Sequence, residues 1–387
     1  MHTVMVNRRA AARLERGHPW VFRSDLEGVP DVPPGSVVRV QLARGKPIGT
    51  AHYSSTSQIA LRMLAERDAV IDEGFLRERL SAAIALRQRV VRDSDSYRVV
   101  YGEADFLPGL VVDRYGDSLA IQTLSQGMDA LQPLIVNLLG ELLHPRAVVE
   151  KNEVQTRALE GLPLRSGVLA GALEGPIIIS LNGLRFEVDL LGGQKTGFFL
   201  DQRENYAAVR RFGRGRALDC FTYGGGFALH LASVCESVEA IDSSATAVAR
   251  ARRNAEENGL GNVSVKEADV FQLLASYQAA RRSFETIVLD PPAFTKSRSR
   301  KEDAGRGYRE INRRALSLLT PGGILVSCSC SHHVSGAELL AAIQEASLDV
   351  RRPVRLLETR SQAACHPIRV GVPETEYLKC FILEAAW

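Results

Sequence analysis

Two cysteines at the end of an apolar run are the first residues whose type and spacing suggest chemistry. Cys328 and Cys330 lie in Ser-Cys-Ser-Cys-Ser, directly after the strand-like run Gly-Gly-Ile-Leu-Val. Side chains two residues apart on a strand share a face, so we expect Cys328 one step deeper toward the core. A thiolate is a soft, reversible nucleophile. A cysteine is equally often a small apolar filler, and the spacing alone leaves both interpretations open.

The cysteines do not predict a metal site or a disulfide framework. His332 and His333 follow Cys330, but this pattern lacks the separated ligand pairs of a zinc site, and no metal is predicted. Six cysteines in 387 residues are too few for a disulfide scaffold. We interpret the remaining four as packing residues: Cys220, Cys235, Cys365 and Cys380.

Polar residues end four predicted strands in the C-terminal half. Three of these strands end in Asp242, Asp269 and Asp290 and the fourth ends in the two cysteines, while an earlier strand that contains Asp219 leads into the turn Thr-Tyr-Gly-Gly-Gly. A single Asp after a strand is more often a helix N-cap than a ligand contact. Polar residues at four strand ends indicate the carboxyl edge of a parallel sheet, where open α/β sheets bind ligands.

The glycine turn points to a nucleoside ligand smaller than a dinucleotide. Glycines let the backbone approach a ligand, and the following helix offers free amides. Neither G-x-G-x-x-G nor G-x-x-x-x-G-K-[ST] is present, which argues against dinucleotide and triphosphate cofactors. Asp242 lies 23 residues after Asp219, where nucleotide folds place the acid that binds ribose hydroxyls. An adenosine-containing ligand fits this pattern better.

These motifs, in this order, resemble class I S-adenosylmethionine-dependent methyltransferases. The resemblance rests on Asp219–Phe227, Asp242, Asp269, the Asp-Pro-Pro-Ala-Phe run from Asp290 and Ser327–Ser331. More narrowly, Gly192–Asn205 and the N-terminal runs HPWVFRSDLEG and SQIALRML resemble bacterial large-subunit rRNA cytosine-C5 methyltransferases. The resemblance covers essentially the whole chain.

The resemblance implies S-adenosylmethionine (SAM) as cofactor. The turn around Tyr223 would hold its methionine part, Asp242 its ribose hydroxyls and Asp269 its adenine amino group, with Val270 or Phe271 against the ring. The full set assigned to the cofactor is Gln202, Arg203, Asp219, Phe221, Tyr223, Gly224, Gly226, Asp242, Asp269 and Val270. Asp201 and Glu204 also have the spacing of a capping box, which predicts that a helix begins there.

The resemblance also implies a covalent mechanism at cytosine. Carbon 5 of a pyrimidine becomes nucleophilic only after a thiolate adds to carbon 6, and position in the motif assigns that role to Cys330. Asp290 would hydrogen-bond the polar edge of the base, and Phe294 would stack on a flipped base. Many RNA cytosine-C5 enzymes carry a second cysteine where this chain has Ala293, so the base that removes the C5 proton is unassigned.

Two other functions remain open at this stage. The Asp-Pro-Pro-Ala-Phe run also resembles enzymes that methylate exocyclic amines of bases, which need no covalent cysteine. A non-catalytic RNA-binding or assembly protein with the same fold is the alternative from a different class.

Basic residues suggest contact with RNA, and the resemblance implies that this RNA is large-subunit (23S) ribosomal RNA. Lys195, Phe294 and Lys296 are assigned to the substrate, and residues 296–306 are predicted to form a basic loop that clamps it. In the first segment, arginines lie beside Trp20 and Phe22, which suits stacking and phosphate contact. These arginines are Arg8, Arg9, Arg13, Arg16 and Arg23. A solvated basic surface explains the same pattern.

The elements that position these residues form three predicted domains. Residues 1–70 form short strands and are expected to be a β-rich PUA-like RNA-binding domain. Residues 71–189 open with a helix over about 72–91 and form a small central α/β domain. Residues 190–387 alternate strand and helix, and the resemblance implies a Rossmann-like, seven-stranded methyltransferase domain there, in which 377–385 is expected to be an antiparallel edge strand.

Composition is that of an ordinary globular protein. Hydrophobic residues make up 45% and charged residues 24%, and the net charge of +3 combines basic ends with an acidic middle. Of the 48 basic residues, 41 are arginines. No run approaches the roughly 18 apolar residues of a membrane span, and we predict a cytoplasmic protein. Whether two chains pair as a homodimer is left open.

Overall fold

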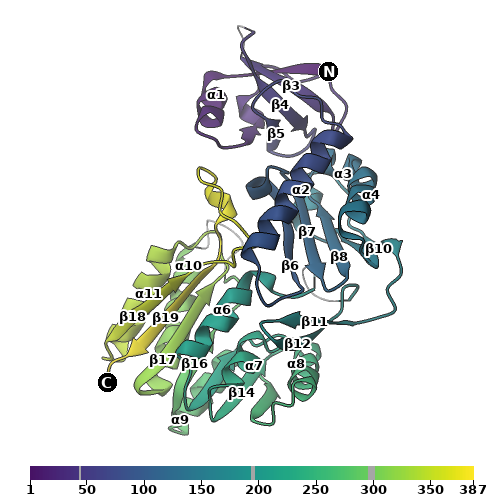
Figure 1. The fold of residues 1–387 in the computed structure, drawn as a ribbon. Coiled ribbons are helices and arrows are strands. Elements are labelled where there is room, and N and C mark those ends of the chain that lie inside the picture. Colours follow the sequence, from purple (N-terminus) through teal and green to yellow (C-terminus); the bar gives the residue numbers. More distant parts are fainter. Residues whose placement is uncertain (43–44, 193–196, 295–300) are drawn as a thin grey trace. The chain divides into compact units, whose positions relative to one another are not determined.

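The chain forms two compact units in a computed structural model that describes residues 1–42, 45–192, 197–294 and 301–387, without the side chains of residues 301 and 302 (Figure 1). The first unit comprises Met1–Ile179, Val188–Phe198 and Ala364–Thr375, and the second comprises Ser180–Glu187, Phe199–Ala363 and Glu376–Trp387. The first unit therefore takes in the predicted segment 1–70 and most of 71–189.

The first unit begins with a five-stranded sheet in the order β1-β3-β4-β5-β2. Its elements are β1 (His2–Val6), α1 (Arg8–Glu15), β2 (Trp20–Phe22), the 3-10 turn η1 (Arg23–Asp25), β3 (Val37–Leu42), β4 (Pro47–Tyr53) and β5 (Ile59–Ala65). Neither β1 nor α1 was predicted. The Asn7 side chain caps α1 by accepting from the amide of Ala10.

A second five-stranded sheet, in the order β10-β9-β8-β7-β6, completes the first unit. Its elements are α2 (Glu73–Val90), β6 (Tyr97–Tyr101), the 3-10 turn η2 (Gly102–Asp105), β7 (Leu110–Tyr115), β8 (Ser118–Thr123), α3 (Gln126–Ala130), α4 (Gln132–Leu143), β9 (Ala147–Lys151), α5 (Gln155–Leu159) and β10 (Ser166–Gly171). The helix predicted over Met128–Leu143 is two helices, because Pro133 lies in the first turn of α4 and favours a new helix start there.

The second unit is built on a seven-stranded sheet in the order β15-β14-β13-β16-β17-β19-β18. The strands are β13 (Arg216–Cys220), β14 (Ser237–Asp242), β15 (Val263–Glu267), β16 (Phe284–Leu289), β17 (Leu319–Ser329), β18 (Val354–Arg360) and β19 (Lys379–Ala385). The first five run parallel and β19 runs antiparallel. The predicted Rossmann-like fold class is confirmed. The prediction that the C-terminal strand forms an edge is wrong, because β18 pairs with its far side.

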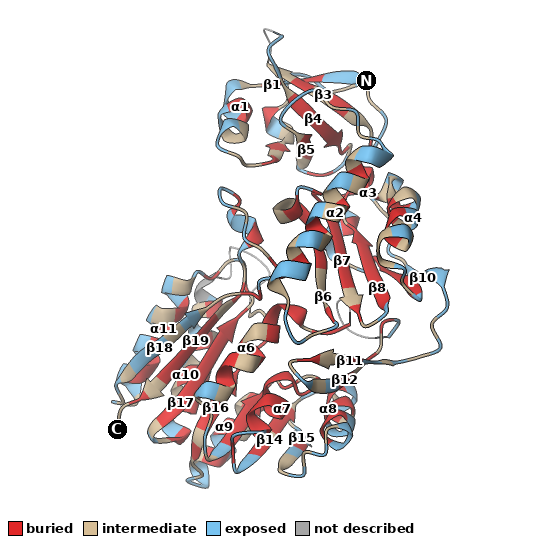
Figure 2. Ribbon diagram, in the orientation of Figure 1, coloured by how far each residue is buried: buried red, intermediate tan, exposed pale blue. Residues whose placement is uncertain are grey.

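Helices cover both faces of this sheet (Figure 1). They are α6 (Arg203–Ala208), α7 (Gly226–Ala232), α8 (Ala245–Glu257), α9 (Val270–Ala279), α10 (Lys301–Leu318) and α11 (Gly336–Asp349). One core cluster joins apolar residues of α9, α10 and α11 to strands β13, β16 and β17. Buried residues concentrate along the strands, and exposed residues lie on the outer sides of the helices (Figure 2). The strand ends are thereby held in fixed register.

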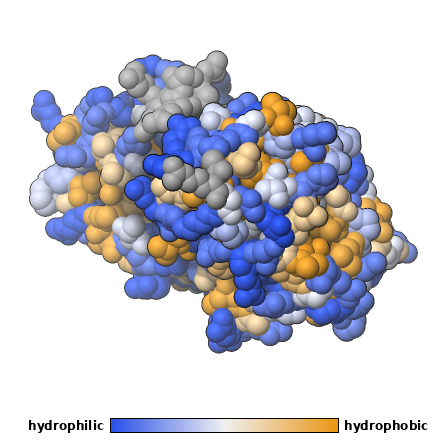
Figure 3. Space-filling model, turned by 90° about the horizontal axis from the view of Figure 1, so that it is seen from above, coloured by the Kyte–Doolittle hydropathy of each residue, from blue (hydrophilic) through white to orange (hydrophobic). Residues whose placement is uncertain are grey.

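Three local features complete the fold. Strands β11 (Ile177–Leu181) and β12 (Leu184–Val188) form a hairpin at the passage from the first unit to the second. Within the described residues, no helix has the length and apolar character needed to cross a membrane. The face seen in Figure 3 is a mosaic of hydrophilic and hydrophobic residues.

Candidate active site

The turn between β13 and α7 adopts a strained backbone. Phe221 (φ 66°) and Tyr223 (φ 50°) lie in the left-handed region, as does Gly225 (φ 89°). Non-glycine residues in that region store strain, which is retained where it serves a function. A side chain at Gly226 would collide with the ring of Tyr206, which explains the glycine there by packing. The sequence analysis did not single out Gly225, the glycine that needs its positive φ.

Asp219 is buried beneath this turn. Its Oδ2 accepts from the Thr222 hydroxyl (2.6 Å) and from the Ala228 amide at the start of α7 (3.0 Å). Its buried Oδ1 has no hydrogen-bond partner among the described residues. Burial first, and then the charge of Asp290, raise the pKa of Asp219 to about 7. A buried acceptor without a donor is costly and fits a ligand that brings one.

Asp242 ends β14 and fixes the turn to the neighbouring strand. Its Oδ2 accepts from the Tyr223 amide (2.9 Å) and its Oδ1 from the Ser244 amide (2.9 Å). A carboxylate has about four acceptor positions, so both oxygens keep capacity for ribose hydroxyls. Tyr223 is itself held by Arg250, whose guanidinium donates to its hydroxyl (3.0 Å).

Asp269 has a structural role that its position in the sequence already suggested. It is the N-cap of α9 and accepts from the Gln272 amide (2.9 Å) through Oδ1. Strand β15 ends at Glu267, two residues earlier than predicted. Val270 is buried at the start of α9, and Phe271 is partly buried. Capping uses one carboxylate oxygen, and the adenine contact assigned to Asp269 stays a prediction.

A side chain from the segment that precedes β13 in the chain contacts the Asp290 carboxylate. Gln202 donates to Oδ2 of Asp290 (3.0 Å) and accepts from the Asn205 amide group (2.6 Å). The predicted Asp201–Glu204 capping box is wrong: Asp201 lies in the 3-10 turn η3 (Leu200–Gln202) and accepts from the Tyr377 hydroxyl. Gln202 therefore orients Asp290, a contact that motif spacing gave no means to predict.

Arg203 is held within its own helix. It is buried, and its guanidinium contacts the Glu204 carboxylate (2.8 Å). Its side chain thus has a structural partner beside the cofactor role assigned to it. Gly224 offers its carbonyl to the Asn254 side chain (2.8 Å), which secures the turn to α8.

Cys328 and Cys330 occupy different environments. Cys328 is fully buried opposite Cys380 of β19, and burial together with that thiol and Asp290 raises its pKa well above the ordinary value. Cys330 lies just beyond the last residue of β17 and is partly exposed. Strand β17 is the neighbour of β16, which ends before Asp290. Only Cys330 of the pair combines access to a substrate with a place at the carboxyl edge.

A lysine from the antiparallel strand lies next to Cys330. Lys379 is opposite Ser329, and its ammonium donates to the carbonyls of Ser331 (2.6 Å) and Tyr377 (2.7 Å). Burial lowers the pKa of Lys379 to about 8, while the charge of a Cys330 thiolate acts in the opposite direction. The sequence analysis did not identify Lys379, because its strand follows Cys330 by about fifty residues.

Phe294 belongs to an aromatic group at the same edge. Its ring centroid lies 4.7 Å from that of Tyr308 and 6.1 Å from that of Phe271. The Tyr308 hydroxyl donates to Ser329 (2.8 Å) next to Cys330. Phe294 is partly buried against these rings. A base would therefore meet Phe294 as part of a packed aromatic surface.

Two predicted substrate residues, Lys195 and Lys296, lie outside the described residues. The predicted clamp loop over 296–306 is wrong in its second half, because helix α10 begins at Lys301. Apolar periodicity of α10 is hidden at its start by the charged run Lys-Glu-Asp. In the described part of the chain, no group of three His, Cys, Asp or Glu residues could hold a metal ion.

Most of the N-terminal arginines predicted to contact RNA are used within the first unit. Arg9 and Arg13 both pair with the buried carboxylate of Asp25. Arg23 donates to the carbonyls of Ser54 and Ser57. These arginines therefore help to hold the small sheet domain together, and their contact with RNA stays a prediction.

Comparison with known proteins identifies the family. The chain is 40% identical to ribosomal RNA large subunit methyltransferase I of Shewanella amazonensis and 38% identical to that of Erwinia tasmaniensis, with 95% of each chain covered. The chain belongs to this methyltransferase family. Residues 4–66 match the PUA-like domain family, and residues 167–358 match the S-adenosylmethionine-dependent methyltransferase family. The chain is thus a SAM-dependent methyltransferase with a PUA-like N-terminal domain.

Solved structures of low sequence identity share its fold. A methyltransferase structure complexed with SAH has a TM-score of 0.86 at 19% identity, and covers 99% of this chain and 100% of its own. A SAM-dependent methyltransferase from Streptococcus mutans has a TM-score of 0.84 at 19% identity over the same shares.

The site fits the cofactor of this family. A buried, unpartnered Asp219 oxygen, the Asp242 carboxylate and the strained turn between them lie at adjacent strand ends. SAM carries an ammonium group, ribose hydroxyls and an adenine amino group, which all donate hydrogen bonds. An edge built of carboxylate acceptors is complementary to those donors.

Proposed function

We propose that this methyltransferase forms 5-methylcytosine in large-subunit ribosomal RNA, with Cys330 as the covalent nucleophile. The observation that carries the proposal is the difference between the two cysteines: Cys328 is sealed in the sheet, and Cys330 stands partly exposed beside Lys379 and the strand that leads to Asp290. Curated relatives are named for ribosomal RNA of the large subunit, which supports the substrate class.

The three carboxylates of the cofactor site each have a proposed role. Asp219 Oδ1 accepts from the ammonium group, Asp242 from the ribose hydroxyls and Asp269 from the adenine amino group, while Val270 and Phe271 contact the ring. When bound, SAM supplies an electrophilic methyl group for transfer to a nucleophilic carbon. Tyr223 and Gly225 hold the turn in the shape that presents these acceptors.

Cys330 begins the covalent cycle. Its thiolate sulfur forms a bond to carbon 6 of cytosine, and the electron pair of the C5–C6 double bond moves into the ring, which makes carbon 5 nucleophilic. After methylation, carbon 5 loses its proton. The sulfur–C6 bond then breaks, the C5–C6 double bond is restored and the thiolate is released.

Asp290 and Gln202 act on the polar edge of the base. Negative charge develops on the ring during thiolate addition, so a proton or hydrogen bond at the N3 and N4 edge lowers the barrier. Gln202 donates a hydrogen bond to one oxygen of Asp290, and this bond fixes the orientation of the carboxylate. Phe294 and its aromatic neighbours supply an apolar surface for a base taken out of its stack.

Lys379 is a positioning residue for the thiolate. A cation near a cysteine favours its ionised form, which is the nucleophile. Two backbone carbonyls, of Ser331 and Tyr377, fix the ammonium beside Cys330. Its lowered pKa of about 8 leaves it mostly charged at neutral pH.

Product analysis tests the proposal. Ribosomal RNA methylated by the purified enzyme is digested to nucleosides and compared with 5-methylcytidine and exocyclic N-methyl standards by mass spectrometry. We expect 5-methylcytidine. A product methylated on an exocyclic amine would replace the C5 mechanism with the N-methyltransferase alternative, for which the Asp290–Phe294 run is also suited.

A further inference from the structure

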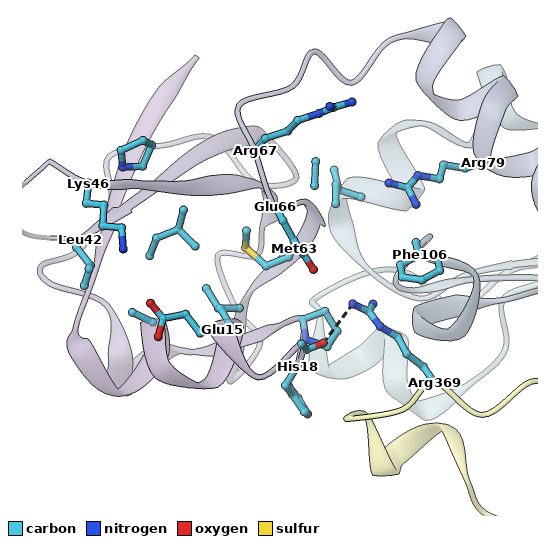
Figure 4. A pocket seen from close by; sticks show the side chains of 18 residues that line it. Glu15, His18, Leu42, Lys46, Met63, Glu66, Arg67, Arg79, Phe106 and Arg369 are labelled. Atoms are coloured by element: carbon cyan, nitrogen blue, oxygen red, sulfur yellow. Dashed lines mark hydrogen bonds between the residues drawn. The ribbon is translucent and has the colours of Figure 1, made fainter.

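A separate pocket of about 670 Å³ lies in the first unit, outside the methyltransferase sheet (Figure 4). One side comes from α1 and from strands β3 to β5 of the PUA-like domain, and the other from Arg79 of α2, Phe106 and Arg369. Contacts within this unit join the two sides: Arg369 donates to the carbonyls of Gly17 (3.1 Å) and Glu103 (3.2 Å). The volume is within the range of about 300–1,000 Å³ usual for ligand sites.

The pocket carries cations that no carboxylate neutralises. Among the described residues, Lys46, Arg67 and Arg79 form no ion pair, although each lines the pocket. Several other arginines of the unit do pair with carboxylates, as in Arg87 with Asp105 and Arg98 with Asp113. With Arg369, four cations line the pocket against two carboxylates, Glu15 and Glu66. The excess of unpaired positive charge suits a polyanion.

Phe106 adds an aromatic surface that packing does not explain. It is 45% exposed and lies in the left-handed region (φ 59°) at the end of η2. A bulky side chain is strained there, and Gly or Asn would serve the turn better. The guanidinium of Arg369 lies 4.5 Å from the ring centroid and that of Arg79 lies 5.3 Å from it. In Figure 4 the Arg79 guanidinium lies close to this ring and is directed toward the pocket.

We propose that this pocket binds a single-stranded nucleotide segment of the RNA substrate. A base stacks against the exposed surface that Phe106, Arg79 and Arg369 form together, and Lys46 and Arg67 contact the phosphates. Aromatic rings and guanidinium planes are the surfaces on which unpaired bases stack. An acidic peptide would use the cations and leave the exposed, strained phenyl ring without a planar partner. The inference rests on the proposed RNA substrate and concerns a site other than the catalytic one.

Binding of a dye-labelled single-stranded RNA of about twelve nucleotides to the full chain, without SAM, tests the pocket. We expect Phe106→Asn and Arg79→Gln each to weaken binding roughly tenfold, in the range of one lost stacking contact. Arg77→Gln is the matched control, because Arg77 lies two residues away on α2 and pairs with Glu73 and Glu141. It should change affinity less than twofold.

Thermal unfolding separates binding from folding. Asn tolerates a positive φ, so Phe106→Asn should unfold at the same temperature as the unsubstituted protein or higher while it loses RNA affinity. Phe106→Asn and Arg79→Gln proteins that both bind RNA within twofold of the unsubstituted protein would overturn the proposal.

Competitors identify the class of ligand. Cytidine monophosphate and an oligoglutamate peptide should both displace the RNA weakly. If the mononucleotide displaced the labelled RNA as strongly as unlabelled RNA does, the pocket would be a free-nucleotide site. If oligoglutamate displaced the labelled RNA that strongly, the pocket would be a site for acidic peptides. Either result contradicts the proposal.

The catalytic proposal fails independently of this one. Loss of RNA affinity in the pocket variants together with an N-methylated product would refute the C5 mechanism and leave the pocket standing. Formation of 5-methylcytidine with unchanged RNA affinity in the pocket variants would do the reverse.

Discussion

The carboxyl edge of the seven-stranded sheet and the pocket of the first unit carry opposite charge. The edge gathers Asp219, Asp242 and Asp290, and burial together with the charges of Asp290 and Asp242 raises the pKa of Asp219. The pocket presents Lys46, Arg67 and Arg79 without acidic partners among the described residues. Acceptors suit a cofactor with a sulfonium, an ammonium and hydroxyl donors, and cations suit RNA. The sign of the charge in each region therefore supports the ligand proposed for it, a difference that the net charge of +3 conceals.

The largest expected effect is on the rate of methyl transfer and leaves ligand binding in both regions unchanged. Cys330→Ala should reduce methyl transfer at least about a thousandfold, because it removes the nucleophile, while the affinities for SAM and RNA stay unchanged. Cys328→Ala is the control on the same strand and should retain activity within about tenfold. Tritium transfer from labelled SAM to ribosomal RNA measures both. A Cys330→Ala enzyme that still transfers methyl groups would refute the covalent mechanism.

A smaller effect is expected at Lys379, a cation placed at the acidic edge beside Cys330. Lys379→Met should lower the rate at pH 7 roughly tenfold and move the acidic limb of the pH–rate profile to higher pH, because the thiolate loses its neighbouring charge. Lys379→Arg should restore much of the profile. A uniform loss of rate at all pH values, with an unshifted profile, would indicate a purely structural lysine.

The acidic edge should make cofactor affinity depend on pH. A cationic ligand prefers ionised Asp219, whose pKa of about 7 implies that SAM affinity rises about tenfold from pH 6 to pH 8. In the protein without cofactor the sign is opposite: the raised pKa means that stability falls as pH rises from about 4 to 7. Asp219→Asn should remove both dependences and leave RNA binding unchanged. Titration calorimetry with SAM checks the first.

The smallest effect concerns the basic pocket. The double substitution Lys46→Gln and Arg67→Gln should weaken RNA binding and reduce the slope of log affinity against log salt by about 1.4, as expected for two lost phosphate contacts on a single strand. Affinity for SAM should not change. If the salt dependence of RNA binding remained that of the unsubstituted protein, these two cations would not contact phosphate.

Much of the methyltransferase sheet could be predicted because its signals are local. Apolar runs ending in Asp219, Asp242 and Asp290 marked the strands, and the glycine turn marked the start of α7. Strand order is a long-range property, so the insertion of β19 between β17 and β18 was missed. In the first unit, α1 was missed because it is short and contains only one large apolar side chain, Leu14, among alanines and charged residues.

The sequence pointed to individual residues of the candidate site, but it predicted few of the contacts between them. The spacing of Cys328 and Cys330 indicated a shared face, and the structure adds that Cys380 closes off the first of them. The contacts of Gln202 with Asp290 and of Lys379 with Ser331 join segments far apart in sequence. Phe106 gave no signal at all, because its exposure and left-handed backbone appear only in the fold.

Trapping of the covalent intermediate tests the central claim most directly. RNA that carries 5-fluorocytidine at the target position cannot complete the cycle, because fluorine does not leave carbon 5 as a proton does. With SAM present, we predict a stable protein–RNA adduct, mapped by mass spectrometry of the digested protein to the peptide that contains Cys330. No adduct on a substrate that binds normally, or an adduct on another residue, would contradict this account.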